Sequence, residues 1–427
     1  MSSSRRGFLG SAGLIGLAAA TPASAAARAP EVAWLQARLD RYQGFGIKAS
    51  GGPGDIATGA WLDEALCGWG YRCERQTFDV PYFETRTATL SSGGAMATVI
   101  PQAIVATTGP NGLTAPLRLA DHGNLSGAIV VIVLPFKRWT ALADPQVAQP
   151  LAKAFAQGAV ATVLVTTGPT GEAIALNVTT HKPGFGRPVA ILAPKDAGPF
   201  LAAVATGQTA TLTIDGQGGQ RSAFNLIARL DRKAPRTLIV STPRSGWFGC
   251  AAERGSGLAV WLWLARWLAK SGHPVNVELL ATSGHEYEYL GGEHYLSIAP
   301  PPASTRLWVH VGASAAARDW HELGPVLRPL PSADSQRVLT ATADIVDRVR
   351  SAFKGVTGLE ATYVADKSTA GGELTNVLSA GYRTAIGLYG GHRYFHTRGD
   401  DRRCVSGDLV APVAVSFQAA IEACLAE

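Results

Sequence analysis

Several motifs that would assign a function directly are absent from this chain of 427 residues. There is no C-x-x-C zinc pattern, no phosphate-binding or dinucleotide-binding glycine motif, and no G-x-S-x-G nucleophile elbow. The nearest approach to the elbow, Gly312 to Ala316, lacks the second glycine. The sequence therefore gives no support to nucleotide chemistry, and little to a serine hydrolase.

Charged residues are also few, at 16% of the chain, while hydrophobic residues make up 47%. The net charge is +6, but lysine and arginine are scattered, with no basic helix and no alternation with aromatics. We therefore expect a well-packed globular protein with no nucleic-acid partner. After the leader, no run of 18 apolar residues occurs, so we expect no membrane span in the mature chain.

Residues 1–28 have the pattern of a leader peptide. Arg5-Arg6 begins a twin-arginine pattern, an apolar run extends from Leu9 to Ala20, and Ala23-Ser24-Ala25 is a cleavage signal. This order predicts a bacterial periplasmic or secreted protein that is exported by the twin-arginine route.

The five cysteines are an odd number, so they cannot all pair within one chain. Cys67 and Cys73 could form a local disulfide in an oxidising compartment. Buried free thiols are an equal alternative, and the sequence leaves the pairing open.

Changes of texture divide the mature chain into three parts. Residues 29–87 carry two expected helices, at 31–44 and 56–69. Residues 88–218 read as a small inserted α/β domain that covers or shapes a site elsewhere, and residues 219–427 read as repeating strand–helix units. The last part predicts an α/β fold with a mostly parallel twisted sheet flanked by helices. Its expected strands are 237–241, 275–282, 306–311 and 384–389, and its expected helices are 257–270, 335–353 and 406–425.

Histidines gather where these strands end. The stretch from Ser283 to Gly292 follows a clean apolar strand and contains His285 and Glu286, while His310 ends the next strand. His392 and His396 follow the last one. Ligands bind at the carboxyl edge of open α/β sheets, and imidazole with carboxylate suggests metal or acid–base chemistry there.

Four segments resemble the zinc aminopeptidase family, metallopeptidase family twenty-eight, which includes bacterial leucyl aminopeptidases, aminopeptidase Y and the glutaminyl cyclases. The resemblance spans essentially the whole mature chain. It implies a zinc-aminopeptidase-like fold, and it makes the 88–218 block similar to the protease-associated domain that larger members carry. The four segments are Asn225–Leu230, Glu253–Gly257, Ser283–Gly292 and Phe395–Asp400.

The resemblance carries over to the active site only in part. Thr242 and Arg244 stand where the family has its first metal-binding histidine and the following aspartate. Arg254 replaces an asparagine in the turn of the bridging carboxylate. The metal-binding positions of the family fall on Glu253, Glu286, His310 and His396, and its general base falls on His285.

Two functions follow from this mapping. One is an exported hydrolase that cuts amide bonds in peptides or small substrates at one zinc ion, which is held by Glu253, Glu286 and His396 with His285 as base. His310 is a further possible ligand. The other is a non-catalytic relative that binds a peptide or another ligand, because Arg244 and Arg254 bring positive charge to a cation site.

Three further residues are candidates for substrate binding: Tyr287, Glu373 and Tyr394. Asp400 and Asp401, which follow His396, could orient that imidazole, or they could cap the final helix. The sequence does not give the substrate or the oligomeric state.

Overall fold

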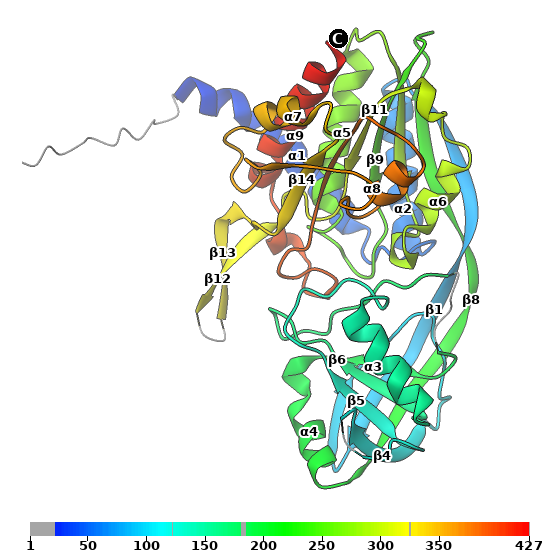
Figure 1. Cartoon of the computed structure of the whole chain (residues 1–427). Helices are drawn as coiled ribbons and strands as arrows, with labels where there is room; N and C mark the ends of the chain where they lie inside the picture. Colours follow the sequence, from blue (N-terminus) through cyan, green and yellow to red (C-terminus); the bar gives the residue numbers. More distant parts are fainter. Residues whose placement is uncertain (1–21, 122, 181–184, 324–325, 427) are drawn as a thin grey trace, which may run out of the picture.

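The computed structural model describes residues 22–121, 123–180, 185–323 and 326–426, and these residues form two lobes (Figure 1). The larger lobe, the main domain, contains both the first helices and the C-terminal part of the chain. The smaller lobe corresponds to the predicted insert. Most of the predicted leader, residues 1–28, lies outside the described residues.

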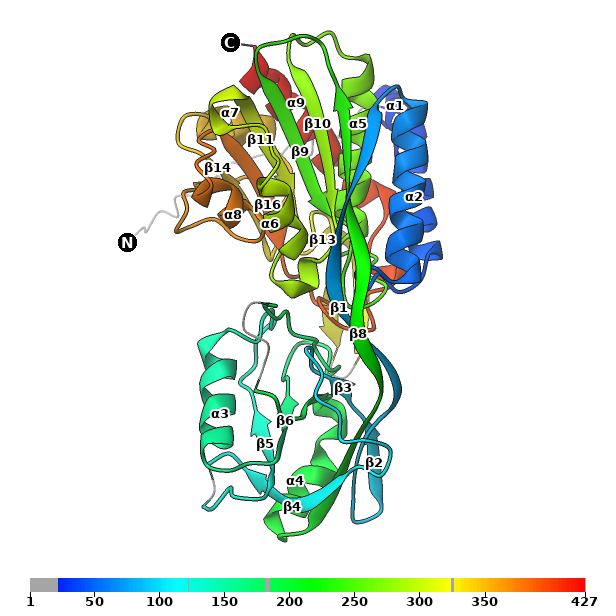
Figure 2. The ribbon, with the colours of Figure 1, turned by 90° about the vertical axis from the view of Figure 1, so that its right-hand side faces the viewer.

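Two long strands connect the lobes. Strands β1 (Arg72–Ser92) and β8 (Thr209–Leu230) pair in antiparallel register from Arg72 opposite Arg229 to Ser91 opposite Thr211. They run through both lobes as one ribbon (Figure 2). The predicted domain limits at 87/88 and 218/219 therefore fall within continuous strands, and the two lobes share one hydrogen-bonded sheet.

The main domain confirms the predicted fold class. Four central strands are parallel, and their order is β16, β11, β9 and β10. Strand β8 extends this sheet in antiparallel register beside β10, while β14 and β15 lie beyond β16. The strand bounds are β9 (Thr237–Pro243), β10 (Asn276–Thr282), β11 (Thr305–Val311), β14 (Arg337–Ala341), β15 (Thr362–Val364) and β16 (Ala385–Gly390).

Helices cover both faces of this sheet. One large apolar core on one face contains buried residues of α1, α5, α7 and α9. A second core contains Tyr295 of α6 and Leu374 and Val377 of α8. Helix α9 is long and apolar enough to cross a membrane, but its buried residues belong to the large core. The helix bounds are α1 (Pro22–Gly44), α2 (Pro53–Gly68), α5 (Gly255–Lys270), α6 (Leu290–Leu296), α7 (Val346–Ala352), α8 (Leu374–Ser379) and α9 (Gly407–Leu425).

The insert has its own small sheet. Strands β4, β5, β6 and β7 are parallel, β3 closes one edge, and β2 pairs with β1. Residues of α3 and α4 belong to separate apolar clusters of this lobe. The bounds are β2 (Ala95–Thr98), β3 (Ile100–Pro101), β4 (Leu113–Leu119), β5 (Ile129–Val133), α3 (Pro145–Ala156), β6 (Ala161–Val165), β7 (Val189–Leu192) and α4 (Gly198–Ala205).

One predicted helix, 335–353, is wrong over its first half. That half is strand β14, which pairs with both β15 and β16, and only the second half forms helix α7. Sheet pairing with two neighbours outweighed the local pattern, because strand preference depends on burial between partners. The hairpin of β12 (Arg318–Leu323) and β13 (Val326–Ala333) was not predicted at all.

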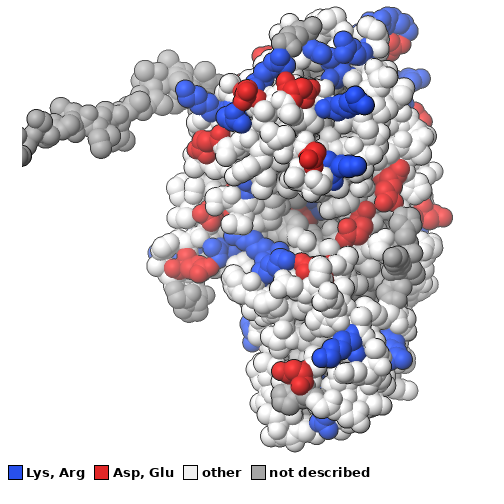
Figure 3. All heavy atoms as spheres, in the orientation of Figure 1, with Lys and Arg blue, Asp and Glu red and all other residues white. Residues whose placement is uncertain are grey.

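Charges of both signs are interspersed over the face shown in Figure 3, which is hollowed where the two lobes meet. Few of the charges on this face lie on the insert. This distribution is consistent with the scattered charge of the sequence.

Candidate functional site

The carboxyl ends of the central strands bring the predicted histidines together in one buried region. Strand β10 ends at Thr282 and leads through Gly284, whose φ is +76°, into the short helix His285–Tyr287. His310 lies within β11, and His396 follows β16. All three histidines are at most 6% exposed.

A carboxylate, a guanidinium and an imidazole meet at the start of helix α5. Arg254 Nη2 lies 2.6 Å from Glu253 Oε1, and His396 Nε2 lies 3.2 Å from the same oxygen. The side chains of all three residues are 1% exposed. Arg254 Nε donates to the Ser245 carbonyl at 2.8 Å, so its guanidinium is fixed at two points.

Asp400 fixes the turn that carries Glu253. Its two carboxylate oxygens accept hydrogen bonds from the backbone N–H groups of Ala252 and Glu253, at 2.8 and 3.0 Å. It lies 3.4 Å from His392 Nε2. Among the described residues, no hydrogen bond or ion pair joins Asp400 to His396, so the expectation that Asp400 orients this imidazole is not supported. His396 Nδ1 instead lies 2.9 Å from the Ala175 carbonyl.

The Glu286 carboxylate is held by serines on two loops. Oε2 accepts hydrogen bonds from Ser50 Oγ and Ser245 Oγ, at 2.6 and 2.7 Å, and Oε1 accepts one from the Ser50 backbone N–H at 3.0 Å. Burial raises the pKa of Glu286, although these hydrogen bonds oppose the shift. Both oxygens therefore have partners within the protein.

His285 and His310 bind polar groups of the main domain. His285 Nδ1 lies 3.2 Å from Glu373 Oε1, which also accepts from Thr282 Oγ at 2.9 Å. His310 Nδ1 lies 3.0 Å from Ser241 Oγ. Because the Ser241 hydroxyl carries no charge, the contact of His310 is of the kind that a neutral core histidine makes.

Buried charges set the ionisation of the site. Burial raises the pKa of the Glu253 carboxyl, but Arg254 and His396 outweigh it and hold the pKa well below its usual range. Burial lowers the pKa of Arg254, but Glu253 reverses this and raises it. Burial, with a contribution from Arg254, lowers the pKa of His285 well below 6.5, and burial lowers that of His310 to about 4. Glu253 and Arg254 are therefore charged at neutral pH, and both of these imidazoles are neutral.

Of the two arginines that the sequence placed near the site, Arg244 turns away from it. Its Nε lies 2.9 Å from Asp55 Oδ1, and its terminal nitrogens donate to the carbonyls of Ala281 and Phe224. Thr242 Oγ1 donates to the Val311 carbonyl. Arg254 alone of the pair contacts Glu253.

The insert contributes to the site through the loop between β6 and β7. Besides the Ala175 carbonyl at His396, the Val178 backbone N–H donates to the Glu286 carbonyl at 3.0 Å. Asn177 Oδ1 accepts from Trp247 Nε1 at 2.8 Å. These contacts support the expectation that this block shapes a site in the rest of the chain.

The predicted metal ligands do not form one compact group. Among the described residues, Glu253, Glu286 and His396 are not a set whose ligand atoms all lie within 4.8 Å of one another. Their assignment, and those of His310 and His285, stay predictions. Two other groups meet that distance: Asp63, Cys67 and Cys73, and His392, Asp400 and Cys404.

The three predicted substrate-binding residues lie in different surroundings. Glu373 is buried against His285, and burial raises its pKa. Tyr287 donates to the Pro81 carbonyl at 2.6 Å, and its ring lies edge-on to Trp247. Tyr394 packs edge-on against Trp320 in the large core.

Ser50 and Ser245 are the site residues that the sequence did not indicate. Ser50 belongs to a Gly/Pro-rich stretch that reads as a simple break between helices. Only the folded chain brings it to Glu286, which lies 236 positions later.

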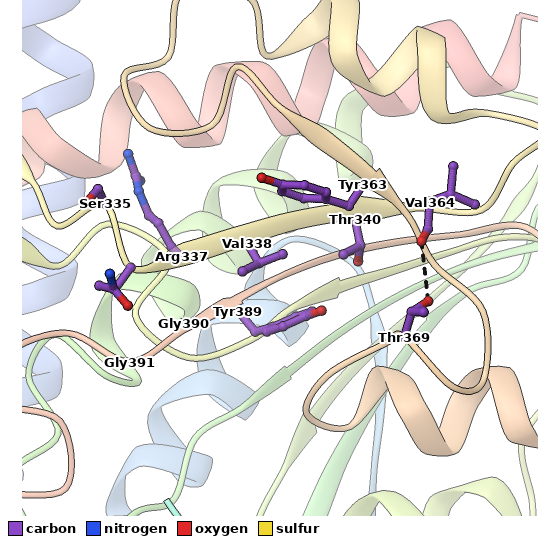
Figure 4. A pocket seen from close by; sticks show the side chains of 11 residues that line it. Ser335, Arg337, Val338, Thr340, Tyr363, Val364, Thr369, Tyr389, Gly390 and Gly391 are labelled. Carbon is purple, nitrogen blue, oxygen red and sulfur yellow. Dashed lines mark hydrogen bonds between the residues drawn. The ribbon is translucent and has the colours of Figure 1, made fainter. Parts of the chain in front are cut away.

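A hollow lies away from this site, beside β14 and β16 (Figure 4). Its volume is about 720 Å³, and Tyr363, Tyr389 and Thr340 are among its lining residues. Arg337 donates to the carbonyls of Ala315 and Thr357. None of the predicted site residues lines this hollow.

The fold is that of the zinc aminopeptidases. The chain is similar to a zinc aminopeptidase from Bacillus subtilis, with a TM-score of 0.71 and 18% identity, covering 92% of this chain and 94% of that one. It is also similar to a Peptidase M28 precursor from Shewanella amazonensis, with a TM-score of 0.72 and 17% identity, covering 93% and 96%.

A third structure of this class is an aminopeptidase from an Aneurinibacillus strain, with a TM-score of 0.64 and 17% identity, covering 92% and 93%. No family model matches the sequence, and no curated protein matches it. At such low identity these likenesses establish the fold, and the function has to be argued from the site.

Proposed function

We propose that this chain is a non-catalytic relative of the zinc aminopeptidases, which binds a peptide or small ligand without hydrolysing it. The observation that carries the proposal is the ion pair between Arg254 and Glu253, at 2.6 Å with both side chains 1% exposed. In this pair the guanidinium supplies the positive charge that a metal ion would supply to the carboxylate.

The carboxylates of Glu253 and Glu286 and the imidazole of His396, as they are arranged, do not fit a zinc ion. A zinc site needs three or four ligand atoms about 2.0–2.3 Å from one point. Both oxygens of Glu286 accept hydrogen bonds from serines, and Glu253 Oε1 faces Arg254. Glu253 Oε2 has no hydrogen-bond partner among the described residues, so together with His396 Nε2 the site offers two unengaged ligand atoms rather than three.

Electrostatics adds to this argument. A guanidinium about 4 Å from a divalent cation would cost roughly 8 kcal/mol at an effective dielectric constant of about 20. Structural zinc sites bind with about 10–16 kcal/mol. The repulsion would therefore remove most of the affinity while Arg254 stays in place.

His396 favours a second candidate function, the one-metal hydrolase. Because the Ala175 carbonyl can only accept, the contact at 2.9 Å assigns the proton to His396 Nδ1, which leaves Nε2 facing Glu253. Nε2 has no hydrogen-bond partner among the described residues. An imidazole held through Nδ1 is the usual orientation of a metal ligand. This function would require Arg254 to leave Glu253.

The test is elemental analysis of the purified protein together with a screen of aminoacyl 4-nitroanilides, with and without added zinc. We expect far less than one zinc per chain and no hydrolysis above a protein-free control. One tightly bound zinc per chain, with hydrolysis that is lost in Glu253→Gln, would show that the hydrolase is the correct function.

A further inference from the structure

A separate cavity of about 220 Å³ lies where the insert meets the main domain. Its walls come from the loop before α2, from β1 and β8, and from the segment after β3. Most of its lining residues are apolar, and five of the sixteen are aromatic: Tyr82, Phe83, Trp247, Phe248 and Tyr287.

The charged residues that line this cavity are two arginines, Arg221 and Arg398. The Arg221 guanidinium lies over the Tyr82 ring, and that of Arg398 lies over the Phe248 ring, at 5.4 and 4.9 Å from the ring centres. Within the described part of the chain, neither arginine has a carboxylate at ion-pair distance, and no acidic residue lines the cavity. Both guanidinium groups are therefore available to an anion.

From these observations we infer that the cavity binds a small carboxylate with an aromatic body, such as the C-terminal residue of a peptide or a free N-acylated amino acid. Planar guanidinium groups bind carboxylates through paired, charge-assisted hydrogen bonds. The aromatic walls cover an apolar ring. A volume below the roughly 300–1,000 Å³ of typical ligand sites limits the bound part to about one residue.

The cavity also contacts the buried site. Arg221 Nε donates to the Ser50 carbonyl at 2.7 Å, and Ser50 Oγ and N–H both bind Glu286. Tyr287, which lines the cavity, follows Glu286 directly. This inference rests on the proposed binding function, and it names the ligand class and the place where the ligand lies.

The experiment is calorimetric titration of the whole protein with N-acetyl-L-phenylalanine and with its uncharged amide, in low salt and with a chelator present. We expect the acid to bind roughly tenfold or more tightly than the amide, because only the acid can pair with the arginines. Arg398→Gln should remove most of that preference, and Arg221→Gln should do the same. Arg383→Gln, at an exposed position between α8 and β16 that does not line the cavity, is the matched control.

A second arm compares a short peptide that ends in phenylalanine with its C-terminally amidated form. Tight binding of the free-acid peptide supports a peptide end as ligand, and binding of N-acetyl-L-phenylalanine alone supports a small free acid. Equal affinity for acid and amide, a preference that survives both arginine variants, or no binding at millimolar ligand would overturn the inference. Because the chelator removes metal, these outcomes are independent of the zinc and hydrolysis assays.

Discussion

Two buried arginines, Arg244 and Arg254, lie ten residues apart in the sequence and make different kinds of contact. Arg244 is bound by Asp55 and by two backbone carbonyls, on the side of the sheet edge that α2 covers. Arg254 is bound by Glu253 and one carbonyl, and its Nη1 has no hydrogen-bond partner among the described residues. Arg244 Nε and Asp55 Oδ1 form an ion pair without hydrogen-bond geometry, while both terminal nitrogens of Arg244 donate to carbonyls. Arg244 is therefore held within the scaffold, whereas Arg254 lies against Glu253 and His396.

The pKa shifts separate the two arginines in the same way. Burial lowers the pKa of Arg244 despite the nearby Asp55. For Arg254 burial also lowers the pKa, but Glu253 and its other neighbours outweigh this and raise it. Four predictions test the comparison, beginning with the largest expected effect.

Replacing Arg244 should cost the most stability. Arg244→Met would leave Asp55 buried and without its ion-pair partner, which costs about 3–5 kcal/mol in comparable sites. The measurement is urea unfolding, with Arg383→Met as the exposed control. A loss below about 1 kcal/mol would mean that Asp55 finds other partners and that this contact is not structural.

Replacing Arg254 should cost less and should create a response to zinc. Arg254→Asn leaves Glu253 in contact with the His396 imidazole, whose Nε2 lies 3.2 Å from the carboxylate. Without the guanidinium, zinc can approach this pair. We expect zinc at about 100 times its dissociation constant to stabilise the variant by about 2.7 kcal/mol and the wild type by much less.

The readout is the melting temperature across a zinc titration. Arg254→Asn/His396→Ala is the control, because it removes a nitrogen ligand and should lose the response. An equal zinc response in the wild type would contradict the view that Arg254 occupies the place of a cation.

A third buried cation, Lys48, sharpens the comparison because no carboxylate pairs with it within the described residues. Its ammonium lies 4.3 Å from the Tyr42 ring centre and donates to the Gly46 carbonyl, and burial lowers its pKa from 10.5 to about 8. Between pH 8 and 10.5 the folded chain holds less of this proton than the unfolded chain. The contribution of Lys48 to stability should therefore rise with pH across that window, by at most about 1.4 kcal/mol per pH unit.

The measurement is the difference in unfolding free energy between the wild type and Lys48→Met from pH 7 to 10.5. Taking the difference removes the titration of tyrosines and cysteines that both proteins share. A flat difference would show that Lys48 keeps its proton in the fold, as the arginines do.

The sequence was sufficient for the fold because the parallel strands and helix α5 carry strong local patterns. Strands 237–241 and 306–311 and helix 257–270 were predicted close to their observed limits. The 335–353 segment failed because β14 is a strand only through its pairing with β15 and β16.

The site was harder to foresee than the fold. The family resemblance implies that Arg254 stands in place of an asparagine, but it does not say where the guanidinium points. Arg244 raised the same expectation, and its side chain pairs with Asp55 instead. The serines that bind Glu286 come from loops that only the folded chain brings together. The burial of each side chain and the direction in which it points decide the chemistry of this site, and neither can be read from the residue type.

The smallest expected effect concerns Ser245, which lies between the two arginines along the chain. Its Oγ donates to Glu286, and its carbonyl accepts from Arg254. Ser245→Ala removes one of three hydrogen bonds to Glu286 and the longer contact from the His285 backbone N–H at 3.3 Å, and it leaves the carbonyl contact intact. The loss of stability should therefore be about 1 kcal/mol. Urea unfolding measures it, and Ser50→Ala, which removes another hydroxyl donor from the same oxygen, is the matched variant. The double variant can lose much more unfolding free energy than the sum of the two single losses. In that case Glu286 depends on the two hydroxyls jointly, and without them it is a buried carboxylate with too few hydrogen-bond donors.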